Sequence, residues 1–139
     1  MKQLFFLSIT ILALALASCG KDDDSPTTYD APQWAVKYSD APMSMTAVIE
    51  LPDEIKKTQS SDDVLAVFIG TDCRAIADQI KGQFFLNIVG EAEETGVLTI
   101  KYYCAKTRYL YQEDGLVSFK ADDVLGTADE PYILSLTSL

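Results

Sequence analysis

The sequence predicts an all-β protein, a single sandwich or barrel of about seven or eight short strands. Three observations lead to this prediction. From about Trp34 onward, apolar residues recur mainly at every second position, which is the period of a half-buried strand. Residues 64–69 are apolar throughout and lie between acidic and turn-forming residues, as expected for a central strand covered on both faces. Turn-forming residues recur about every 8–12 positions, which is the spacing of small all-β domains.

The first strands follow directly from this pattern. Residues 45–51 alternate apolar and polar side chains, and the strand ends at Pro52. The next segment, 53–60, contains helix-forming residues but is short and follows a proline, so we expect one helical turn at most. The apolar strand at 64–69 then enters a turn at Gly70.

The chain is expected to return from this turn along a strand at 73–80. A short helix at 75–81 is the alternative, and the strand is favoured. Residues 84–89 form another predicted strand, which ends at Gly90. The strand predicted at 97–106 has an apolar face made of Leu98, Ile100, Tyr102 and Cys104.

The last part of the domain is predicted to contain three strands. The first covers 109–112, and an Asp-Gly turn at 114–115 leads into the second, at 116–120. The final strand, 132–136, begins after Pro131. The sequence shows no internal repeat and no second domain.

Residues 1–18 have the organisation of a secretory signal peptide, so we exclude them from the domain. Lys2 supplies a positive charge, and the 14 residues from Leu4 to Ala17 are almost all apolar. A run of this length is too short to span a bilayer, which takes about 20 residues.

The signal ends in Leu16-Ala17-Ser18-Cys19, which resembles the lipobox of bacterial lipoproteins. The resemblance implies that Cys19 becomes the lipidated N-terminus; a plain signal peptide or an uncleaved anchor is the alternative. The following Gly-Lys-Asp-Asp-Asp sequence resembles an export signal of Bacteroidetes lipoproteins, which implies a lipid-anchored outer-membrane protein on the cell surface; a generic acidic linker is the alternative. We expect 19–32 to be a flexible acidic tether and 33–139 to be the sandwich domain.

Charge and composition argue against several functions. The chain has 21 acidic and 11 basic residues, a net charge of −10 and no histidine. We expect no nucleic-acid partner, because such binding depends mainly on Lys and Arg contacts with phosphates. Without histidine there is no Ser-His-Asp triad, no Cys-His pair and no histidine metal ligand, so we expect that the protein is not an enzyme.

The stretch DVLAVFIGTDCRAIA at 63–77 resembles part of the small β-sandwich modules of secreted Bacteroidetes proteins. Further similar segments follow in the same order, at 85–90 and 100–107, and at Phe119, Gly126-Thr127 and Pro131-Tyr132. The resemblance spans most of 43–136 and implies an immunoglobulin-like sandwich, although Ala75 and Cys104 depart from the family pattern. It implies little about activity.

Cys73 and Cys104 remain once Cys19 carries lipid. In an oxidising compartment they could form a disulfide that closes a loop of 32 residues and contributes about 3–4 kcal/mol. Cys104 lies on the apolar face of its strand, and Cys73, which alternates with Ala75 and Ala77, could also face inward. Two buried thiols are the alternative. The resemblance favours the thiols, because the family's cysteine usually has no partner at the position of Cys104.

Acidic pairs recur in the predicted loops, and we expect them to be solvated charges that keep an exported protein soluble. Two pairs at one end of a sandwich could supply oxygen ligands for Ca²⁺, but the sequence has no Asp-x-Asp-x-Asp-Gly loop. No other metal or cofactor is expected. The pairs within the domain are Asp53-Glu54, Asp62-Asp63, Glu93-Glu94, Glu113-Asp114, Asp122-Asp123 and Asp129-Glu130.

Tyr103, Tyr109, Tyr111 and Arg108 form the candidate ligand-binding cluster. Exposed tyrosines suit both sugar rings and protein partners. The alternative is that they cap the edge of the core. Trp34, the single tryptophan, is expected to pack the first strand onto the core.

These observations predict a lipid-anchored, non-catalytic binding module of the cell envelope that holds a glycan or a protein partner. The alternative is a structural or accessory subunit of an envelope or adhesion complex. A small hydrolase is the least favoured reading, because no carboxylate is marked out from the others.

Overall fold

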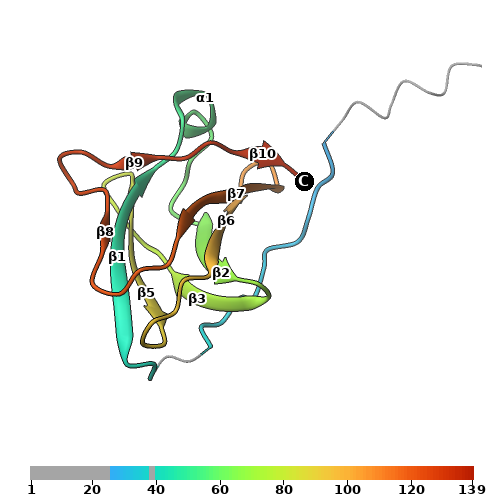
Figure 1. Ribbon diagram of the computed structural model, residues 1–139. Coiled ribbons are helices and arrows are strands. Elements are labelled where there is room, and N and C mark those ends of the chain that lie inside the picture. Colours follow the sequence, from blue (N-terminus) through green and yellow to red (C-terminus); the bar gives the residue numbers. More distant parts are fainter. Residues whose placement is uncertain (1–25, 38–39) are drawn as a thin grey trace, which may run out of the picture.

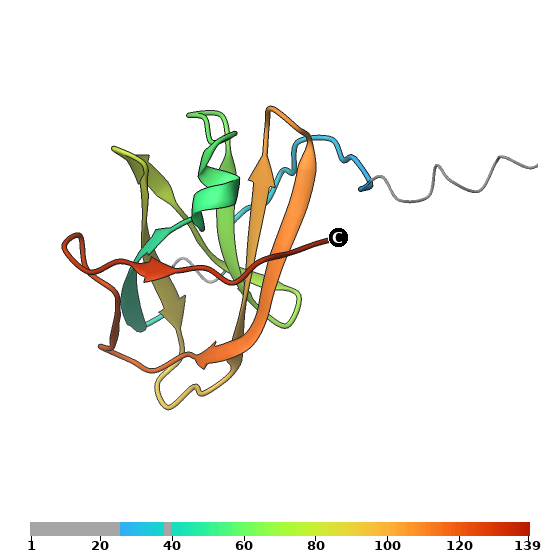
Figure 2. The same cartoon turned by 90° about the horizontal axis from the view of Figure 1, so that it is seen from above.

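The computed structural model describes residues 26–37 and 40–139, with the backbone alone at 114–116. Within these residues, ten strands form two sheets that pack face to face, and one short helix lies between the first two strands (Figures 1 and 2). The predicted all-β class and the β-sandwich are therefore confirmed. The predicted signal peptide, 1–18, and the predicted lipidation site, Cys19, lie outside the described residues.

Sheet 1 is built around β1, which pairs with β5 along one edge and with β8 and β9 along the other. The β1–β5 pair is antiparallel, whereas β8 and β9 run parallel to β1. The outer strand β4 pairs with β5. The strands of sheet 1 are β1 (Met43–Glu50), β4 (Asp78–Ile80), β5 (Gln83–Gly90), β8 (Val124–Leu125) and β9 (Tyr132–Ile133).

Sheet 2 is antiparallel, in the order β10-β7-β6-β2-β3. Its central strand β6 pairs with β7 on one side and with the apolar strand β2 on the other. The strands of sheet 2 are β2 (Val64–Ile69), β3 (Asp72–Ile76), β6 (Val97–Cys104), β7 (Tyr109–Ser118) and β10 (Thr137–Ser138).

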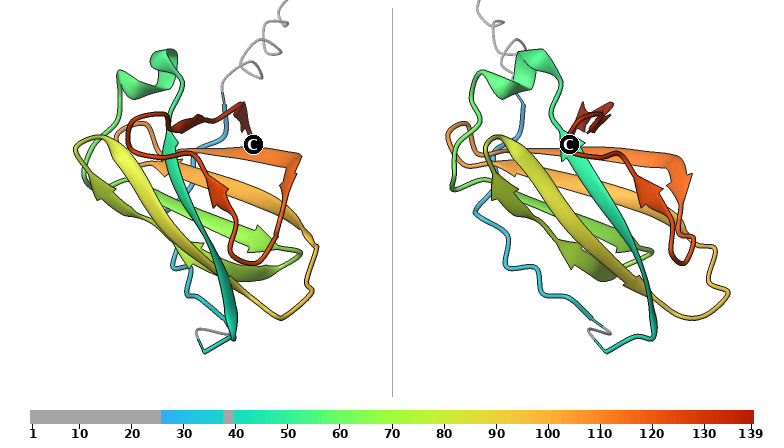
Figure 3. Two further views of the ribbon diagram at one scale, coloured as in Figure 1. Left: turned by 60° about the vertical axis from the view of Figure 1, so that its left-hand side comes forward. Right: turned by 90° about the vertical axis from the view of Figure 1, so that its left-hand side faces the viewer.

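The chain crosses between the sheets on both sides of the sandwich (Figure 3). On one side it passes from β3 in sheet 2 to β4 in sheet 1 through Ala77. On the other side it passes from β9 in sheet 1 to β10 in sheet 2. These crossings limit the length of the exposed sheet edges, which would otherwise offer unpaired backbone groups to other chains.

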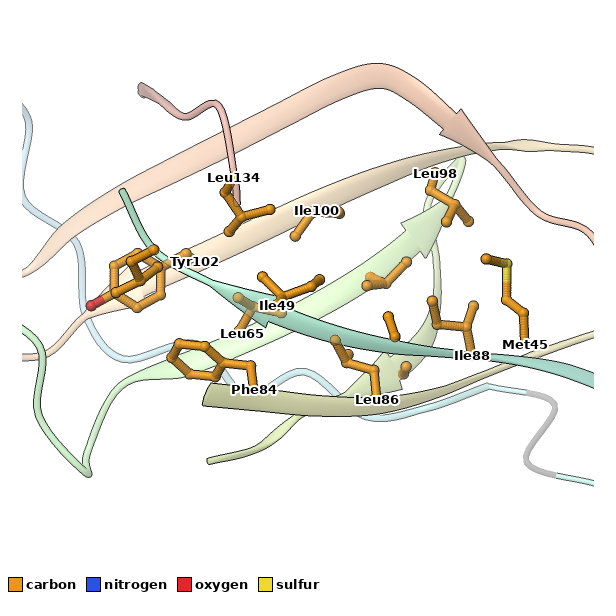
Figure 4. Close-up of a cluster of buried hydrophobic side chains, with 14 of the residues drawn as sticks. Met45, Ile49, Leu65, Phe84, Leu86, Ile88, Leu98, Ile100, Tyr102 and Leu134 are labelled. Carbon is orange, nitrogen blue, oxygen red and sulfur yellow. The ribbon is translucent and has the colours of Figure 1, made fainter. Parts of the chain in front are cut away.

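The main core lies between the two sheets and contains the side chains that the period-two pattern turns inward (Figure 4). Met45, Ala47 and Ile49 of β1 face Leu98, Ile100 and Tyr102 of β6. Phe84, Leu86 and Ile88 of β5, with Phe119 and Leu134, complete this apolar layer. The predicted inward face of the strand at 97–106 is therefore confirmed.

Three strand predictions are wrong in their boundaries. The predicted strand at 73–80 is divided into β3 and β4, because the chain changes sheets at Ala77. The predicted last strand at 132–136 is shorter than expected, because β9 covers only Tyr132–Ile133 beside β1. The chain then crosses to sheet 2, where β10 begins at Thr137, after the predicted range.

The predicted turn at 114–115 is also wrong, because β7 continues through it. Thr99 of β6 pairs with Asp114, and Val97 pairs with Ser118, so β7 contains extra residues opposite this part of β6. The Asp-Gly pair thus lies in a bulge of one long strand. A glycine within a strand pattern is compatible with either a turn or a bulge, so the sequence alone did not distinguish the two.

The predicted single helical turn is confirmed as α1 (Asp53–Lys56), which joins β1 to the segment before β2. In the part of the chain that the structure describes, no helix is long and apolar enough to cross a membrane.

Candidate functional site

Two of the predicted ligand-binding residues, Tyr103 and Arg108, hold the chain's own N-terminal segment. The Tyr103 hydroxyl donates a hydrogen bond to the Tyr29 carbonyl oxygen at 2.9 Å, and Arg108 Nε donates to the same oxygen at 3.2 Å. The Tyr29 amide donates to the Arg108 carbonyl at 2.8 Å, and Arg108 Nη2 lies 2.6 Å from Asp30 Oδ1. Tyr103 is only 3% exposed, so the prediction of an exposed ring at this position is wrong.

Trp34 lies further along the same segment and packs on the outer face of sheet 2. Its ring meets Phe68 edge-on, with centroids 5.4 Å apart. Phe68 forms a small second cluster with Ala66 and Cys73, and Trp34 and Val36 pack against it. The prediction that Trp34 packs the first strand onto the core is therefore wrong, because the chain crosses the outside of sheet 2 before β1 begins.

We call residues 29–37 the strap. Its last residue, Lys37, donates its amide to the Cys73 carbonyl at 2.8 Å and places its ammonium 3.4 Å from Asp72. The strap thus crosses sheet 2 from the β6–β7 turn to the start of β3 (blue in Figure 1). Docking begins at Tyr29, within the segment 19–32 that the sequence assigns to the tether.

The other two predicted residues, Tyr109 and Tyr111, lie on the opposite side of sheet 2. The Tyr111 ring stacks on the buried Tyr102 with centroids 5.9 Å apart, and Tyr109 meets Tyr111 edge-on at 6.4 Å. Burial raises the pKa of Tyr111. The four predicted residues therefore do not form one cluster. Tyr103 and Arg108 hold the strap, whereas Tyr109 and Tyr111 lie at the edge of the core, as the alternative interpretation expected.

Both described cysteines are free and buried, so the alternative of two buried thiols holds and the disulfide does not. Cys104 belongs to the main core between the sheets, whereas Cys73 belongs to the cluster on the outside of sheet 2. The two thiols thus lie on opposite faces of one sheet.

A β-bulge explains why Cys73 does not face inward. Val67 pairs with Ala75 and Phe68 pairs with Cys73, so β3 contains one extra residue, Arg74, between two consecutive pairs. The bulge breaks the alternation between positions 73 and 75. Ala75 joins the main core and Cys73 joins the outer cluster.

The two thiols differ in their surroundings. Burial raises the pKa of Cys73, whose Sγ lies 3.6 Å from the Ala75 carbonyl oxygen. Burial also acts to raise the pKa of Cys104, but hydrogen bonds with Thr107 and Thr58 outweigh it and lower that pKa below its ordinary value. Cys104 Sγ lies 3.4 Å from the Thr58 carbonyl oxygen. It has no measurable exposure, so its thiol has no access to a soluble substrate in the folded state.

Asp63 is the centre of a buried polar network at the end of the sandwich that carries α1. It accepts hydrogen bonds from the Ser60 amide at 2.8 Å, the Ala105 amide at 2.9 Å and the Tyr102 hydroxyl at 2.5 Å. Burial, and then the carboxylate of Asp63, raise the pKa of Tyr102 far above its ordinary value. The network joins the segment before β2 to the β6–β7 turn.

Arg74, the bulge residue, ties β3 to the loop between β5 and β6. Its two terminal nitrogens lie 2.7 and 2.8 Å from the two carboxylate oxygens of Glu94, and Nη1 also donates to the Val89 carbonyl at 3.2 Å. The hydrogen bonds from Arg74 lower the pKa of Glu94. Arg74 is buried and the Glu94 side chain is 17% exposed, so this is a part-buried, bidentate ion pair.

Glu113 fixes the C-terminal segment to β7. It accepts hydrogen bonds from the Tyr132 hydroxyl at 2.8 Å and from the Ser135 amide at 2.6 Å. Burial and the neighbouring Glu113 raise the pKa of Tyr132 to about 12. The prediction that the acidic pairs are solvated loop charges is therefore wrong for Asp63, Glu94 and Glu113, each of which has a structural role.

The outer face of sheet 1 is a surface that the sequence analysis did not identify. The strand register places three rows of side chains on it. The rows are Ile80, Gln83, Glu50 and Ile133; Asp78, Phe85 and Val48; and Asn87, Thr46 and Val124. Its aliphatic side chains are prominent, since Ile80 is 51%, Val124 58% and Ile133 51% exposed.

Part of this face is held in place by polar contacts. Gln83 Nε2 donates to Glu50 Oε2 at 2.9 Å and to the Ala128 carbonyl at 2.9 Å, and Lys56 Nζ lies 2.5 Å from Glu50 Oε1. The hydrogen bond from Lys56, followed by that from Gln83, lowers the pKa of Glu50. On strands that alternate, the outward positions are expected to be polar. Val48, Phe85 and Ile80 are apolar residues at such positions, and this departure from the pattern is the sequence signal for the face.

Among residues 26–37 and 40–139, no group of three or more Cys, Asp or Glu side chains is placed to hold a metal ion. No family model, curated protein or solved structure matches this chain.

Proposed function

We propose that this protein is a lipid-anchored, non-catalytic binding module of the bacterial cell envelope, and that it binds a protein partner through the outer face of sheet 1. The observation that carries the proposal is the group of exposed aliphatic side chains on this face. Ile80, Val124 and Ile133 surround the half-buried Phe85 and Val48. Contiguous exposed apolar surface on a small domain is typical of an interaction site.

A protein partner fits these observations better than a glycan. Sugar rings stack on flat, exposed aromatic rings, and the tyrosines that suggested a glycan are used within the fold. Tyr103 holds the strap, and Tyr111 stacks on Tyr102. The outer face of sheet 1 instead offers branched aliphatic groups, which pack well against the apolar centre of another protein.

The charge around this face indicates the chemistry of the partner. Asp78 lies on the face, and Asp123 and Glu130 are exposed beside β8 and β9. The chain as a whole has a net charge of −10. We therefore infer a partner whose contact surface has an apolar centre and a basic rim, since complementary charge speeds association and excludes acidic competitors.

The lipid anchor rests on the sequence. The apolar segment before Leu16-Ala17-Ser18-Cys19 and the acidic residues after it support lipidation at Cys19 and an outer-membrane location on the cell surface. Protease treatment of intact cells tests the location, because a surface protein is degraded and a periplasmic one is protected.

We also infer that the sandwich is immunoglobulin-like. The order β4-β5-β1 in one sheet and β7-β6-β2-β3 in the other is the order of strands D-E-B and G-F-C-C′ of that fold. The edge of β1 where strand A would lie is occupied by β8 and β9.

Site-specific photo-crosslinking of the full-length protein in intact cells tests the partner. A photo-reactive residue at Val124 or Ile133 is expected to give one dominant protein adduct, which disappears when Ile80→Asp is added. The matched control is Val97, which is 50% exposed but belongs to sheet 2. The same adducts from Val97 as from Val124, or no adduct at either, would contradict the proposal.

A further inference from the structure

Because the strap is docked on sheet 2, the N-terminal part of the chain leaves the sandwich at a different end from the one where β1 begins. Met43, the first residue of β1, pairs with Gly90 and therefore lies at the end that carries the β5–β6 loop. The strap runs back from this end across sheet 2, and Tyr29 is bound at Arg108 in the β6–β7 turn. The chain therefore leaves the folded domain at the opposite end from the start of β1 (Figures 1 and 3).

The register defines the two ends. One end, which we call the strap-exit end, carries α1, the β4–β5 turn and the β6–β7 turn, because Ile49 pairs with Phe84 and Val64 pairs with Tyr103. The other end, the far end, carries the β2–β3 turn and the β5–β6 loop, because Ile69 pairs with Leu98. An eight-residue strand separates them, which is about 27 Å.

We infer that the strap sets the orientation of the domain on the membrane, with the strap-exit end facing the bilayer and the far end facing away. This inference rests on the lipid anchor in the proposed function. With the strap docked, the tether from Cys19 joins the domain at Tyr29. With the strap released, the chain would leave from Met43 at the far end, and the domain could turn over.

The contacts that hold the strap are of unequal strength. The Arg108–Asp30 ion pair is exposed, with side chains 52% and 97% accessible, so solvent screens it and it contributes little. The hydrogen bond from Tyr103 and the Trp34–Phe68 contact each involve a buried side chain of sheet 2, so they are expected to dominate. Tyr103→Phe and Trp34→Ala are therefore the informative changes, and both lie outside the proposed partner face.

Energy transfer to a bilayer tests the orientation. The full-length acylated protein is reconstituted into phosphatidylcholine vesicles that contain an acceptor lipid. A donor dye is attached through Lys57→Cys at the strap-exit end or Thr95→Cys at the far end, both at exposed positions. With the ends about 27 Å apart, transfer is expected to be at least about twofold more efficient from position 57 than from position 95.

The strap variants supply the second arm. Tyr103→Phe is expected to reduce the difference between the two positions, and the double change with Trp34→Ala to remove it, whereas the control Tyr109→Phe retains it. Continued protection of Cys104 from alkylation shows that each variant is folded. Protein that enters the vesicles but gives equal transfer from both positions overturns this inference alone. Protein that does not enter the vesicles overturns the lipid anchor as well.

Discussion

The hydroxyl of Tyr102 donates a hydrogen bond to Asp63 Oδ2 at 2.5 Å, and both residues are buried. We expect Tyr102→Phe to lower the free energy of unfolding by about 1–3 kcal/mol, because it leaves a buried carboxylate with one partner fewer. Urea denaturation followed by circular dichroism measures the change. Tyr109→Phe, at a half-buried ring outside this network, is the control and is expected to change stability by less than about 0.5 kcal/mol. Equal effects of the two substitutions would contradict the role given to Asp63.

The Arg74–Glu94 pair is expected to make stability depend on pH at the acidic end. Its hydrogen bonds lower the pKa of Glu94 below the ordinary 4.5, so the folded state favours the charged carboxylate. The stabilisation is complete above pH 4.5 and is lost as the pH falls through the lowered pKa.

Arg74→Met removes this pair and is expected to lower the free energy of unfolding by about 1.5–3 kcal/mol at neutral pH, since the part-buried Glu94 loses its charge-assisted hydrogen bonds. The free energy of unfolding of the variant should also fall less between neutral pH and pH 3 than that of the unmodified protein. Glu50, whose pKa is lowered by Lys56, contributes in the same direction and stays intact in the variant. Urea denaturation at several pH values tests this, and an unchanged pH dependence would show that Arg74 does not stabilise the charged form of Glu94.

Tyr132 is expected to lose its proton only near pH 12, because burial and Glu113 raise its pKa to about 12. The folded pKa lies above the ordinary value of 10, so the contribution to stability is complete below pH 10 and is lost between pH 10 and 12. Ultraviolet absorbance of the phenolate follows the titration. Tyr132→Phe should remove one late-titrating group and flatten the alkaline loss of stability.

Gly126 lies where the chain passes β1 between β8 and β9. Its φ is +78°, and a Cβ at this position would lie 2.5 Å from the Val48 carbonyl oxygen and 2.6 Å from the Tyr132 amide nitrogen. Gly126→Ala is therefore expected to destabilise the protein by about 3 kcal/mol or more, from backbone strain and a steric clash with atoms that cannot move aside. Gly82→Ala is the matched control, with φ +83° and open space around the Cβ, and should cost only about 1 kcal/mol.

Cys73 reports whether the strap is docked. It is 5% exposed in the cluster that Trp34 covers, whereas Cys104 lies in the main core. Trp34→Ala is expected to raise the alkylation rate of Cys73 by roughly tenfold, since loss of the ring contact and its buried area makes local opening easier by about 1–2 kcal/mol. The rate at Cys104 should not change. Mass spectrometry of peptides distinguishes the two sites, and equal acceleration at both would indicate general unfolding instead of strap release.

The alternating pattern predicted the sandwich and its core well, because burial on one face of a strand leaves a direct signal in the sequence. The apolar runs around Leu65 and Ile100 are strands at the expected positions. The errors are of two kinds: β3 ends without a turn residue, whereas the Asp-Gly pair at 114–115 lies within the continuous strand β7. Nothing in the composition of 73–80 shows that the chain leaves sheet 2 at Ala77, since both halves remain extended.

The candidate site was harder to predict, because local sequence does not tell which partner a side chain meets. Tyr103 has the same aromatic and basic neighbours whether it binds a ligand or the backbone of Tyr29. Cys73 was expected to share a face with Ala75, and only the bulge at Arg74 separates them. The proposed partner face was overlooked because its residues come from five strands that are distant in sequence.

The position of the strap also determines how the protein responds to mechanical force. A pull between an anchored Cys19 and a bound partner would load the contacts at Tyr29 directly, and these few contacts would give way before the hydrogen-bonded sheets do. Release of the nine residues from 29 to 37 would add about 30 Å of extended chain. The strap would then act as an extensible joint that yields before the sandwich unfolds, and it could dock again once the tension falls.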